Sequence, residues 1–243
     1  VTGSCSSGDG NVTVAITGAS PASTSVSCTT DTFTAGFDVS GITDGGNVLS
    51  ISASQTDAAG NTGNDSAQAD KDASAPTVSL DAPADVNTSN QANYGVSGSC
   101  ITGEGDVTVT ITGASPASAN VSCTTDIFSA SFDVSGVTDG VGALSISASQ
   151  TDAAGNTGND SAQADKDATA PAVSIDVPSD ANAANQAAYG VTGSCETAEG
   201  DVTIAITGAS PASTSVSCTG NVFSASFDVS GITDGSNALD ISA

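Results

Sequence analysis

The strongest alternation of apolar and polar residues in the chain runs Phe33-Thr34-Ala35-Gly36-Phe37-Asp38-Val39. Because successive side chains of an extended backbone point to opposite faces, this run would place its apolar residues on one face and its polar residues on the other. Shorter runs with the same two-residue period occupy positions 12–16 and 49–53. No stretch has the period of an amphipathic helix. These runs therefore predict half-buried β-strands.

Turn-forming residues separate the predicted strands. Gly18-Ala19-Ser20-Pro21 ends one run, and the glycine-rich segment 41–46 separates two others. Short strands rich in Thr, Val and Ser, with turn signals about every 8–12 residues, are typical of an antiparallel β-sandwich. The sequence therefore predicts an all-β protein built from immunoglobulin-like β-sandwiches.

One unit of sequence recurs along the chain. Val1-Thr2-Gly3-Ser4-Cys5 returns at 96–100, with Ser97 in place of Thr, and again at 191–195, a spacing of 95 residues without a shift of register. A repeat of this length has the size of a small domain. We expect boundaries near residues 74 and 169, because Pro76 and Pro171 suit the first residue of a strand. Residues 1–73 would form a repeat lacking its first strand, 74–168 a complete repeat, and 169–243 a repeat lacking its last strand, in an end-to-end array.

The second copy allows the core to be predicted residue by residue. The alternation places eight side chains inside: Val107, Val109, Ile111, Phe128, Phe132, Val134, Leu144 and Ile146. It places four outside: Thr108, Thr110, Ser129 and Asp133. A register with Asp133 inside would bury an unpaired carboxylate, which is costly.

The ends of the chain fall inside repeats, which leaves two interpretations. A longer polypeptide would continue in register on both sides, which is the interpretation we favour. Alternatively, the incomplete sandwiches would be completed by a strand from a neighbouring copy, as in a filament assembled by donor-strand exchange.

The composition limits the partners. The chain has 27 acidic residues and only two basic ones, giving a formal charge of −25. Such a surface repels nucleic acid and anionic lipid, so we expect neither as a partner. No run of apolar residues is long enough to span a bilayer. His and Arg are absent, which removes the usual residues of acid–base and phosphoryl-transfer catalysis, so we do not expect an enzyme.

The cysteines occur as one pair in each copy, always 23 residues apart. Six cysteines allow fifteen pairings, and the repeat symmetry favours the three local ones. A zinc site would need four close ligands, and no Cys-x-x-Cys is present. We therefore expect disulfides, with all six cysteines on inward-facing strand positions, and an extracellular or cell-surface location. The predicted pairs are Cys5–Cys28, Cys100–Cys123 and Cys195–Cys218.

Two short motifs occur together in the chain. Thr56-Asp57-Ala58-Ala59-Gly60-Asn61 is followed by Asp72-Ala73-Ser74-Ala75-Pro76, and the second copy has the same pair at 151–156 and 167–171. This coupling resembles the tandem bacterial immunoglobulin-like repeats of large surface adhesins and biofilm-associated proteins. The resemblance implies a structural stalk or fibre that serves adhesion or a biofilm matrix. The cysteine pair departs from the common pattern of those repeats.

The resemblance also implies calcium at the junctions between repeats. Ca²⁺ takes six to eight oxygen ligands, which loops rich in Asp and Asn can supply. The alternatives are that Asp-Ala-Ala-Gly-Asn is an ordinary turn and that the other carboxylates are solvated. We interpret Asp44-Gly45 and Asp139-Gly140 as turns between strands. At the junction near residues 165–171, Lys166 would offset part of the negative charge of the Asp residues. The calcium ligands that we expect near one end of each repeat are Asp57, Asn61, Asp70, Asp72 and Asp81 in the first set and Asp152, Asn156, Asp165, Asp167 and Asp176 in the second.

A second class of function is a binding module whose sandwich recognises a surface glycan or protein. Glycan sites are usually marked by exposed aromatic rings, and the chain has only two Tyr and six Phe. The Phe residues lie at alternating positions that favour a core role. We therefore expect a structural repeat region whose partners are neighbouring repeats or copies of itself.

Overall fold

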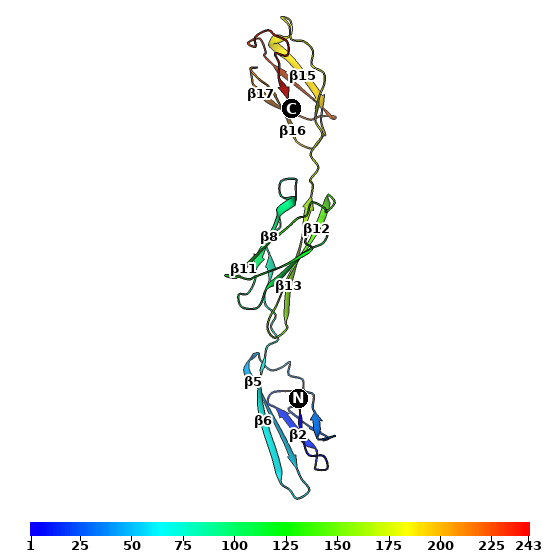
Figure 1. Cartoon of the computed structure of the whole chain (residues 1–243), viewed down its shortest axis with the longest axis vertical. Helices are drawn as coiled ribbons and strands as arrows, with labels where there is room; N and C mark the ends of the chain where they lie inside the picture. The colour runs from blue at the N-terminus through cyan, green and yellow to red at the C-terminus, as the bar shows by residue number, and fades with distance from the viewer. The chain divides into compact units, whose positions relative to one another are not determined.

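The computed structural model describes residues 1–243 and is nearly all β (Figure 1). Two compact units divide the chain, Val1–Lys166 and Asp167–Ala243. The first unit holds two separate hydrophobic cores and the second holds one. The boundaries predicted near residues 74 and 169 fall between these cores. The helical segments are 3₁₀ turns of three residues, and neither has the length or the apolar character needed to cross a bilayer.

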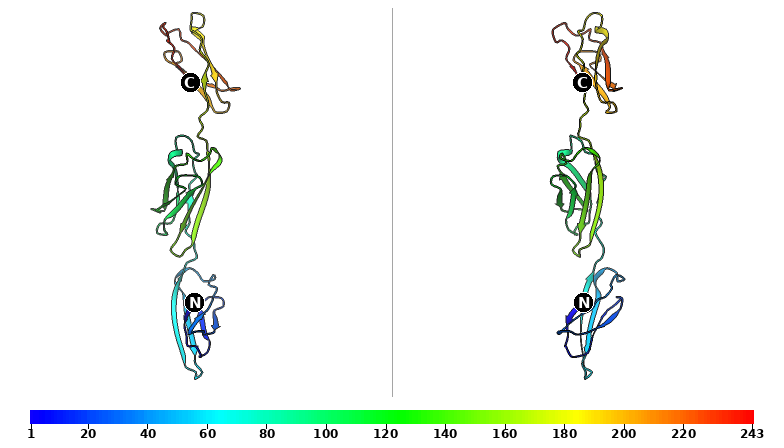
Figure 2. Two further views of the ribbon diagram at one scale, coloured as in Figure 1. Left: turned by 45° about the vertical axis from the view of Figure 1, so that its right-hand side comes forward. Right: turned by 90° about the vertical axis from the view of Figure 1, so that its right-hand side faces the viewer.

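The middle core belongs to a sandwich of two antiparallel sheets. One sheet has the strand order β10-β9-β12-β13 and the other β11-β8-β7. The hairpin of β12 and β13 runs the length of this sandwich in both turned views of Figure 2. The elements are β7 (Ser79–Leu80), η1 (Gln91–Asn93), β8 (Tyr94–Ser99), β9 (Val107–Ile111), β10 (Ser118–Val121), β11 (Ile127–Phe132), β12 (Gly140–Thr151) and β13 (Thr157–Lys166).

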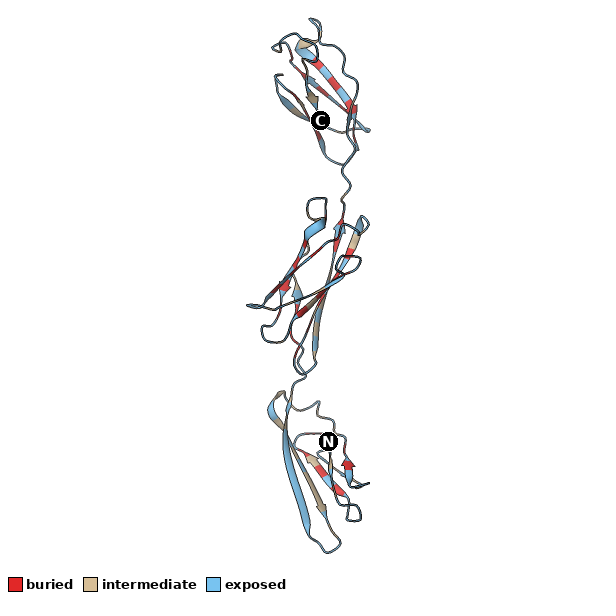
Figure 3. Cartoon of the chain, viewed as in Figure 1, coloured by how far each residue is buried: buried red, intermediate tan, exposed pale blue.

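The core of the middle sandwich confirms the predicted alternation. All eight predicted side chains are buried, and Phe132 is only 1% exposed. Ser129 and Asp133 face solvent, whereas Thr108 and Thr110 are half-buried. Figure 3 shows the buried and exposed residues alternating along the strands. Tyr94 and Val86 join this core as well, and the Tyr94 hydroxyl donates a hydrogen bond of 2.6 Å to Ala84 O.

The other two sandwiches repeat this plan incompletely. In the first, β3-β2-β5-β6 faces the pair β1-β4. In the third, β14-β15-β18 faces β17-β16-β19. The elements are β1 (Thr2–Ser4), β2 (Val12–Ile16), β3 (Ser23–Val26), β4 (Thr32–Thr34), β5 (Gly45–Thr56), β6 (Thr62–Lys71), β14 (Ser174–Ile175), η2 (Gln186–Ala188), β15 (Tyr189–Ser194), β16 (Asp201–Ile206), β17 (Ser213–Ser217), β18 (Val222–Phe227) and β19 (Ile241–Ser242).

Residues 33–39, which alternate most strongly in the sequence, form a shorter strand than the equivalent residues of the other two sandwiches. The strand β4 ends at Thr34, whereas β11 and β18 each have six residues. In the middle sandwich β11 pairs with β8 as far as Phe132 opposite Tyr94, whereas β4 pairs with β1 only as far as Thr34 opposite Thr2. Phe37, the counterpart of Phe132, is therefore only half-buried. In the middle sandwich the second half of the corresponding run is paired, with Ser131 opposite Gly95 and Phe132 opposite Tyr94.

The cysteines are joined in the three predicted pairs, with Cα–Cα distances of 5.9, 6.0 and 6.0 Å. Their placement on strands is wrong in detail, because each lies one or two residues beyond a strand end. Cys100 follows β8, and Cys123 lies beyond the end of β10. The disulfides therefore tie the ends of strands in opposite sheets.

Candidate functional site: the linker between the first two sandwiches

The tips of the two long hairpins are built from the Asp-Ala-Ala-Gly-Asn motif. Asp57 Oδ1 accepts hydrogen bonds from the backbone amides of Ala59 and Asn61, and Asp57 Oδ2 accepts one from Asn61 Nδ2 at 2.9 Å. Gly60 has φ +90°, a conformation that glycine adopts without strain. The hydrogen bond from the Asn61 side chain is the main cause of the lowered pKa of Asp57. The motif is therefore a turn in which the Asp57 carboxylate is hydrogen-bonded by residues of the same motif.

The same turn recurs in the middle sandwich. Asp152 is buried and accepts hydrogen bonds from the Asn156 backbone amide at 2.8 Å and from Asn156 Nδ2 at 2.9 Å. These bonds, with the side-chain bond from Asn156 foremost, lower the pKa of Asp152. The carboxylate is thus held in its charged form by the loop that contains it.

The remaining predicted calcium ligands of the first set lie elsewhere. Asp70 Oδ1 accepts a hydrogen bond from the Asn47 amide, and Asp72 Oδ1 accepts one from the Ser74 amide. Asp81 Oδ2 accepts a hydrogen bond from Ser97 Oγ at 2.5 Å. Of the second set, Asp165 binds the amide of Gly142, Asp167 that of Thr169, and Asp176 the hydroxyl of Thr192.

The length of each hairpin separates the predicted ligands at its tip from those at its other end. Thr56 pairs with Thr62 at one end of the β5–β6 hairpin, and Gly45 pairs with Lys71 at the other. A strand of ten residues such as β6 spans about 33 Å. Asp57 and Asp72 lie beyond opposite ends of this hairpin, so they cannot ligate one ion within one repeat. No group of three or more carboxylates has the spacing of a metal site.

The linker between the first two sandwiches is the segment between Lys71 and Leu80. Its first residues are hydrogen-bonded to Asp44. Asp44 Oδ1 accepts a hydrogen bond from Lys71 Nζ within an ion pair, and Asp44 Oδ2 accepts bonds from the Ala73 amide at 3.1 Å and from Ser74 Oγ at 2.8 Å. These contacts, led by the bond from Lys71, lower the pKa of Asp44 to about 2. One carboxylate thus binds the last residue of β6, Lys71, and two residues of the linker, Ala73 and Ser74.

The same linker is held from the other side by the middle sandwich. Asn156 Nδ2 donates a hydrogen bond of 3.3 Å to Asp72 O, and the amide of Leu80 donates one of 2.8 Å to Asp160 Oδ2. Pro76 is buried, and its carbonyl oxygen lies directly against Gly158. The segment between Lys71 and Leu80 is therefore tied to both sandwiches of the first unit.

The chain's only two basic residues occupy the same repeat position. Lys166 Nζ lies 2.6 Å from Asp139 Oδ1, as Lys71 pairs with Asp44, and the Lys166 side chain is only 4% exposed. Interpreting Asp44-Gly45 and Asp139-Gly140 as plain turns missed this role. The signal was available in the sequence, because two lysines spaced by one repeat in a chain of charge −25 mark a position where a cation is needed.

Neither a protein-family model nor a curated protein matches the chain. Solved structures with a similar fold include a Ca²⁺-stabilised adhesin that helps an Antarctic bacterium reach out and bind ice, with 23% identity, a TM-score of 0.40 and coverage of 100% of this chain and 66% of that one. A tetra-tandem repeat in the extending region of a large adhesion protein has 24% identity, a TM-score of 0.34 and coverage of 96% and 63%. A 1.5-MDa bacterial ice-binding adhesin has 21% identity, a TM-score of 0.43 and coverage of 95% and 79%. The chain thus spans less than two thirds of the length of the first two.

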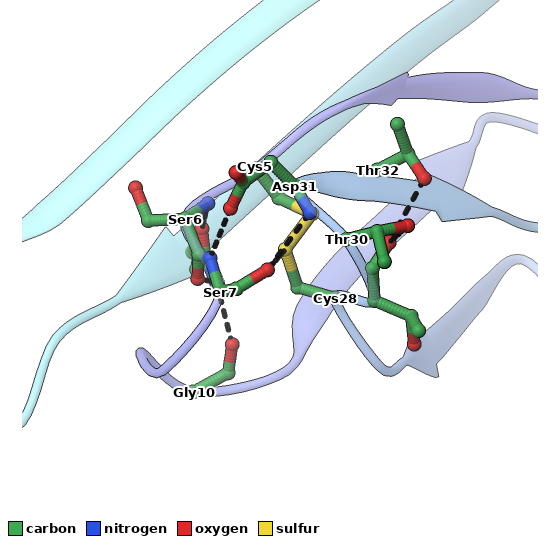
Figure 4. Close-up of a disulfide and its surroundings, with 10 residues drawn as sticks. Cys5, Ser6, Ser7, Gly10, Cys28, Thr30, Asp31 and Thr32 are labelled. Carbon is green, nitrogen blue, oxygen red and sulfur yellow. Dashed lines mark hydrogen bonds between the residues drawn. A yellow bond between two sulfur atoms is a disulfide. The ribbon is translucent and has the colours of Figure 1, made fainter.

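Two loops beside each disulfide exchange a pair of hydrogen bonds, and Figure 4 shows this for Cys5–Cys28. The Ser7 amide donates to Asp31 Oδ1 at 3.0 Å, and the Asp31 amide donates to Ser7 Oγ at 2.8 Å. Asp31 has φ +60°, which Asp tolerates better than most residues, and it lies in a tight turn between Thr29 and Thr32. Thr102 and Asp126 make the corresponding hydrogen bonds beside the second disulfide, and Thr197 and Asn221 make them beside the third. The side chains around the disulfide therefore have a structural role.

Proposed function

We propose that the chain is a structural repeat region, a stalk or fibre, of a secreted or cell-surface bacterial adhesin or extracellular filament. The observation that carries this proposal is the linker between the first two sandwiches, which is tied to both. Asp44 holds Ala73 and Ser74 on one side, and Asn156 holds Asp72 on the other. A flexible connection would leave such backbone groups to water. A tied linker suits a region whose task is to keep successive domains in a fixed order and spacing.

The disulfides support the proposed location. Three of them occur in 243 residues, one for each sandwich, and no cysteine is free. Disulfides of this kind form and persist in oxidising surroundings outside the cytoplasm. They also stabilise sandwiches whose cores are built largely from small and β-branched side chains.

The aromatic side chains favour a structural role over a glycan-binding one. Seven of the eight are buried, and the eighth, Phe37, is half-buried in the first sandwich. A sugar-binding face needs exposed rings against which the sugar can stack. The partners in this proposal are therefore neighbouring repeats or further copies of the chain, and the proposal assigns it no catalytic role.

Calcium at the junctions stays a prediction that rests on the resemblance to adhesin repeats. The carboxylates of Asp44 and Asp152, which lie beside the first linker, already have partners, since Asp44 binds Lys71 and Asp152 binds Asn156. We propose that Lys71 and Lys166 supply the positive charge that the acidic linkers require.

Small-angle X-ray scattering on the chain tests the proposal. We expect an extended particle, and we expect a wider spread of distances within the particle after Asp44→Ala, which frees the linker between the first two sandwiches. Asp9→Ala is the control, because it removes the same charge from an exposed position outside the linker. A compact, clustered wild-type particle would overturn the stalk proposal.

A further inference from the structure

The chain offers few positions to a protease that cuts after basic residues. Enzymes of the trypsin type bind a Lys or Arg side chain in a pocket that contains a carboxylate, and they cut the bond that follows it. The sequence has no Arg and only two lysines, Lys71 and Lys166. Exposed loops are the usual sites of proteolytic cleavage, yet both lysines are the last residues of long strands, β6 and β13. The loops therefore contain no cleavage site for this class of enzyme.

Both lysine side chains are withheld from solvent by an ion pair. Lys71 Nζ donates a hydrogen bond to Asp44 Oδ1, and the Lys71 side chain is 13% exposed. Lys166 Nζ lies 2.6 Å from Asp139 Oδ1, and the Lys166 side chain is 4% exposed. Binding to a protease would exchange this internal carboxylate for the one in the enzyme's pocket, and it would leave Asp44 or Asp139 without its cation. The exchange therefore gains little, because breaking a buried pair leaves an unpaired charge behind.

The main chain at both lysines is engaged as well. Lys71 pairs with Gly45 in the β5–β6 ladder, and Lys166 pairs with Gly140 in the β12–β13 ladder. Just beyond Lys71, the Ala73 amide donates a hydrogen bond of 3.1 Å to Asp44 Oδ2. A paired segment must open locally before it can enter a protease cleft, so the cleavage rate follows the population of the opened form. Asp44 thus binds both the side chain and the backbone that cleavage would have to release.

Acidic residues flank both lysines. The two sequences are Asp70-Lys71-Asp72 and Asp165-Lys166-Asp167. An active site that selects a cation through its own negative charge repels carboxylates on either side of that cation. The local sequence and the fold therefore oppose cleavage in the same direction.

We propose that the ion pairs Lys71–Asp44 and Lys166–Asp139 protect the chain from extracellular proteases that cut after basic residues. Each pair supplies positive charge to an acidic chain in a form that such an enzyme does not reach. Opening a pair frees the bond Lys71–Asp72 or Lys166–Asp167, and cleavage there falls between hydrophobic cores rather than within one. This protection does not depend on the stalk function.

Digestion of the folded 243-residue chain with trypsin tests the proposal. We expect the wild-type chain to disappear at least tenfold more slowly than the variant Asp44→Ala, measured by intact mass over time. The variant should give the fragments 1–71 and 72–243, because Lys166 keeps its partner. Asp9→Ala is the control for the lost charge, since Asp9 is exposed and lies outside the linker. Cleavage of Asp44→Ala no faster than that of the wild type would overturn the proposal.

The middle sandwich provides a second, independent variant. Asp139→Ala should give the fragments 1–166 and 167–243, so the test stands even if the first sandwich of Asp44→Ala fails to fold. The melting temperature of each variant reports whether it folds. Resistance of both folded variants would overturn the proposal.

Two further digests separate the ion pairs from other causes of resistance. Ser40→Lys places a lysine on an exposed turn of the first sandwich, and the folded variant should be cut there at least tenfold faster than the wild type is cut anywhere. The reduced and denatured wild-type chain should be cut after both Lys71 and Lys166. Resistance of the denatured chain would mean that the flanking Asp residues alone protect it, which would also overturn the role given to the ion pairs.

Discussion

Ser74 Oγ donates a hydrogen bond of 2.8 Å to Asp44 Oδ2, across 30 residues of sequence. Asp44 belongs to a loop of the first sandwich, whereas Ser74 lies at the start of the segment that enters the middle one. Lys71 and the amide of Ala73 bind the same carboxylate. The junction therefore depends on one side chain with several partners.

Replacing Asp44 by Ala should loosen the linker without unfolding either sandwich. The amide of Ala73 loses its acceptor, so its hydrogen exchange should become faster, while exchange within β9 and β12 stays unchanged. Mass spectrometry of deuterium uptake measures both. Asp9→Ala is the control, because Asp9 is exposed and lies outside the linker. Unchanged exchange at residues 72–75 would contradict the role given to Asp44.

The Asp44 contacts should also give the chain a pH dependence at low pH. The pKa of Asp44 falls from 3.8 to about 2 on folding, mainly through the hydrogen bond from Lys71. A carboxylate with a lowered folded-state pKa stabilises the fold above its unfolded pKa, and this contribution is lost as the pH falls from about 4 to about 2. Melting temperatures of the wild type and of Asp44→Asn should differ near neutral pH and converge toward pH 2. Parallel curves over this range would contradict the prediction.

Phe132→Ala should destabilise the middle sandwich by about 3–5 kcal/mol, the usual cost of removing a buried Phe side chain. The matched substitution Phe37→Ala should cost less, because Phe37 is half-buried whereas Phe132 is 1% exposed. Chemical denaturation with a probe in each sandwich measures the two free energies of unfolding. Equal losses would show that the first sandwich is packed as fully as the middle one.

Opening the disulfide of the middle sandwich with Cys100→Ser and Cys123→Ser should cost about 2–4 kcal/mol, the range typical of such cross-links. The melting temperature should fall, while far-ultraviolet circular dichroism at room temperature should retain the strand signal, since the core residues remain. Loss of the strand signal at room temperature would mean that the cross-link is required for folding itself.

The calcium site implied by the adhesin resemblance predicts that calcium raises the melting temperature of the chain and that a chelator reverses the rise, since a ligand that binds only the folded state raises its stability. Calorimetry with calcium and then with chelator measures this, and Asp152→Asn should abolish the rise. An unchanged melting temperature would contradict the calcium prediction. Asp57→Asn is the matched control at the other hairpin tip.

Features encoded within a few residues could be predicted from the sequence. The alternation at 107–111 predicts which side chains are buried, because a strand's two faces follow directly from its two-residue period. The 95-residue repeat reduces the cysteine pairings to local ones, because equivalent sequences fold in the same way. The turn at Asp57-Ala58-Ala59-Gly60-Asn61 is satisfied by its own residues, so it too is local.

Features that join distant residues were decided by the tertiary structure alone. The long β5–β6 hairpin places Asp57 and Asp72 beyond opposite ends, although they are only 15 residues apart in sequence. The same hairpin brings Lys71 to Asp44, 27 residues away, and so places an ion pair at the start of the linker. Gly98 and Gly158 look like ordinary strand glycines until the backbone of residues 76–79 is seen against them. Strand length and pairing set these distances, and both depend on which strands lie beside each other in the folded sandwich.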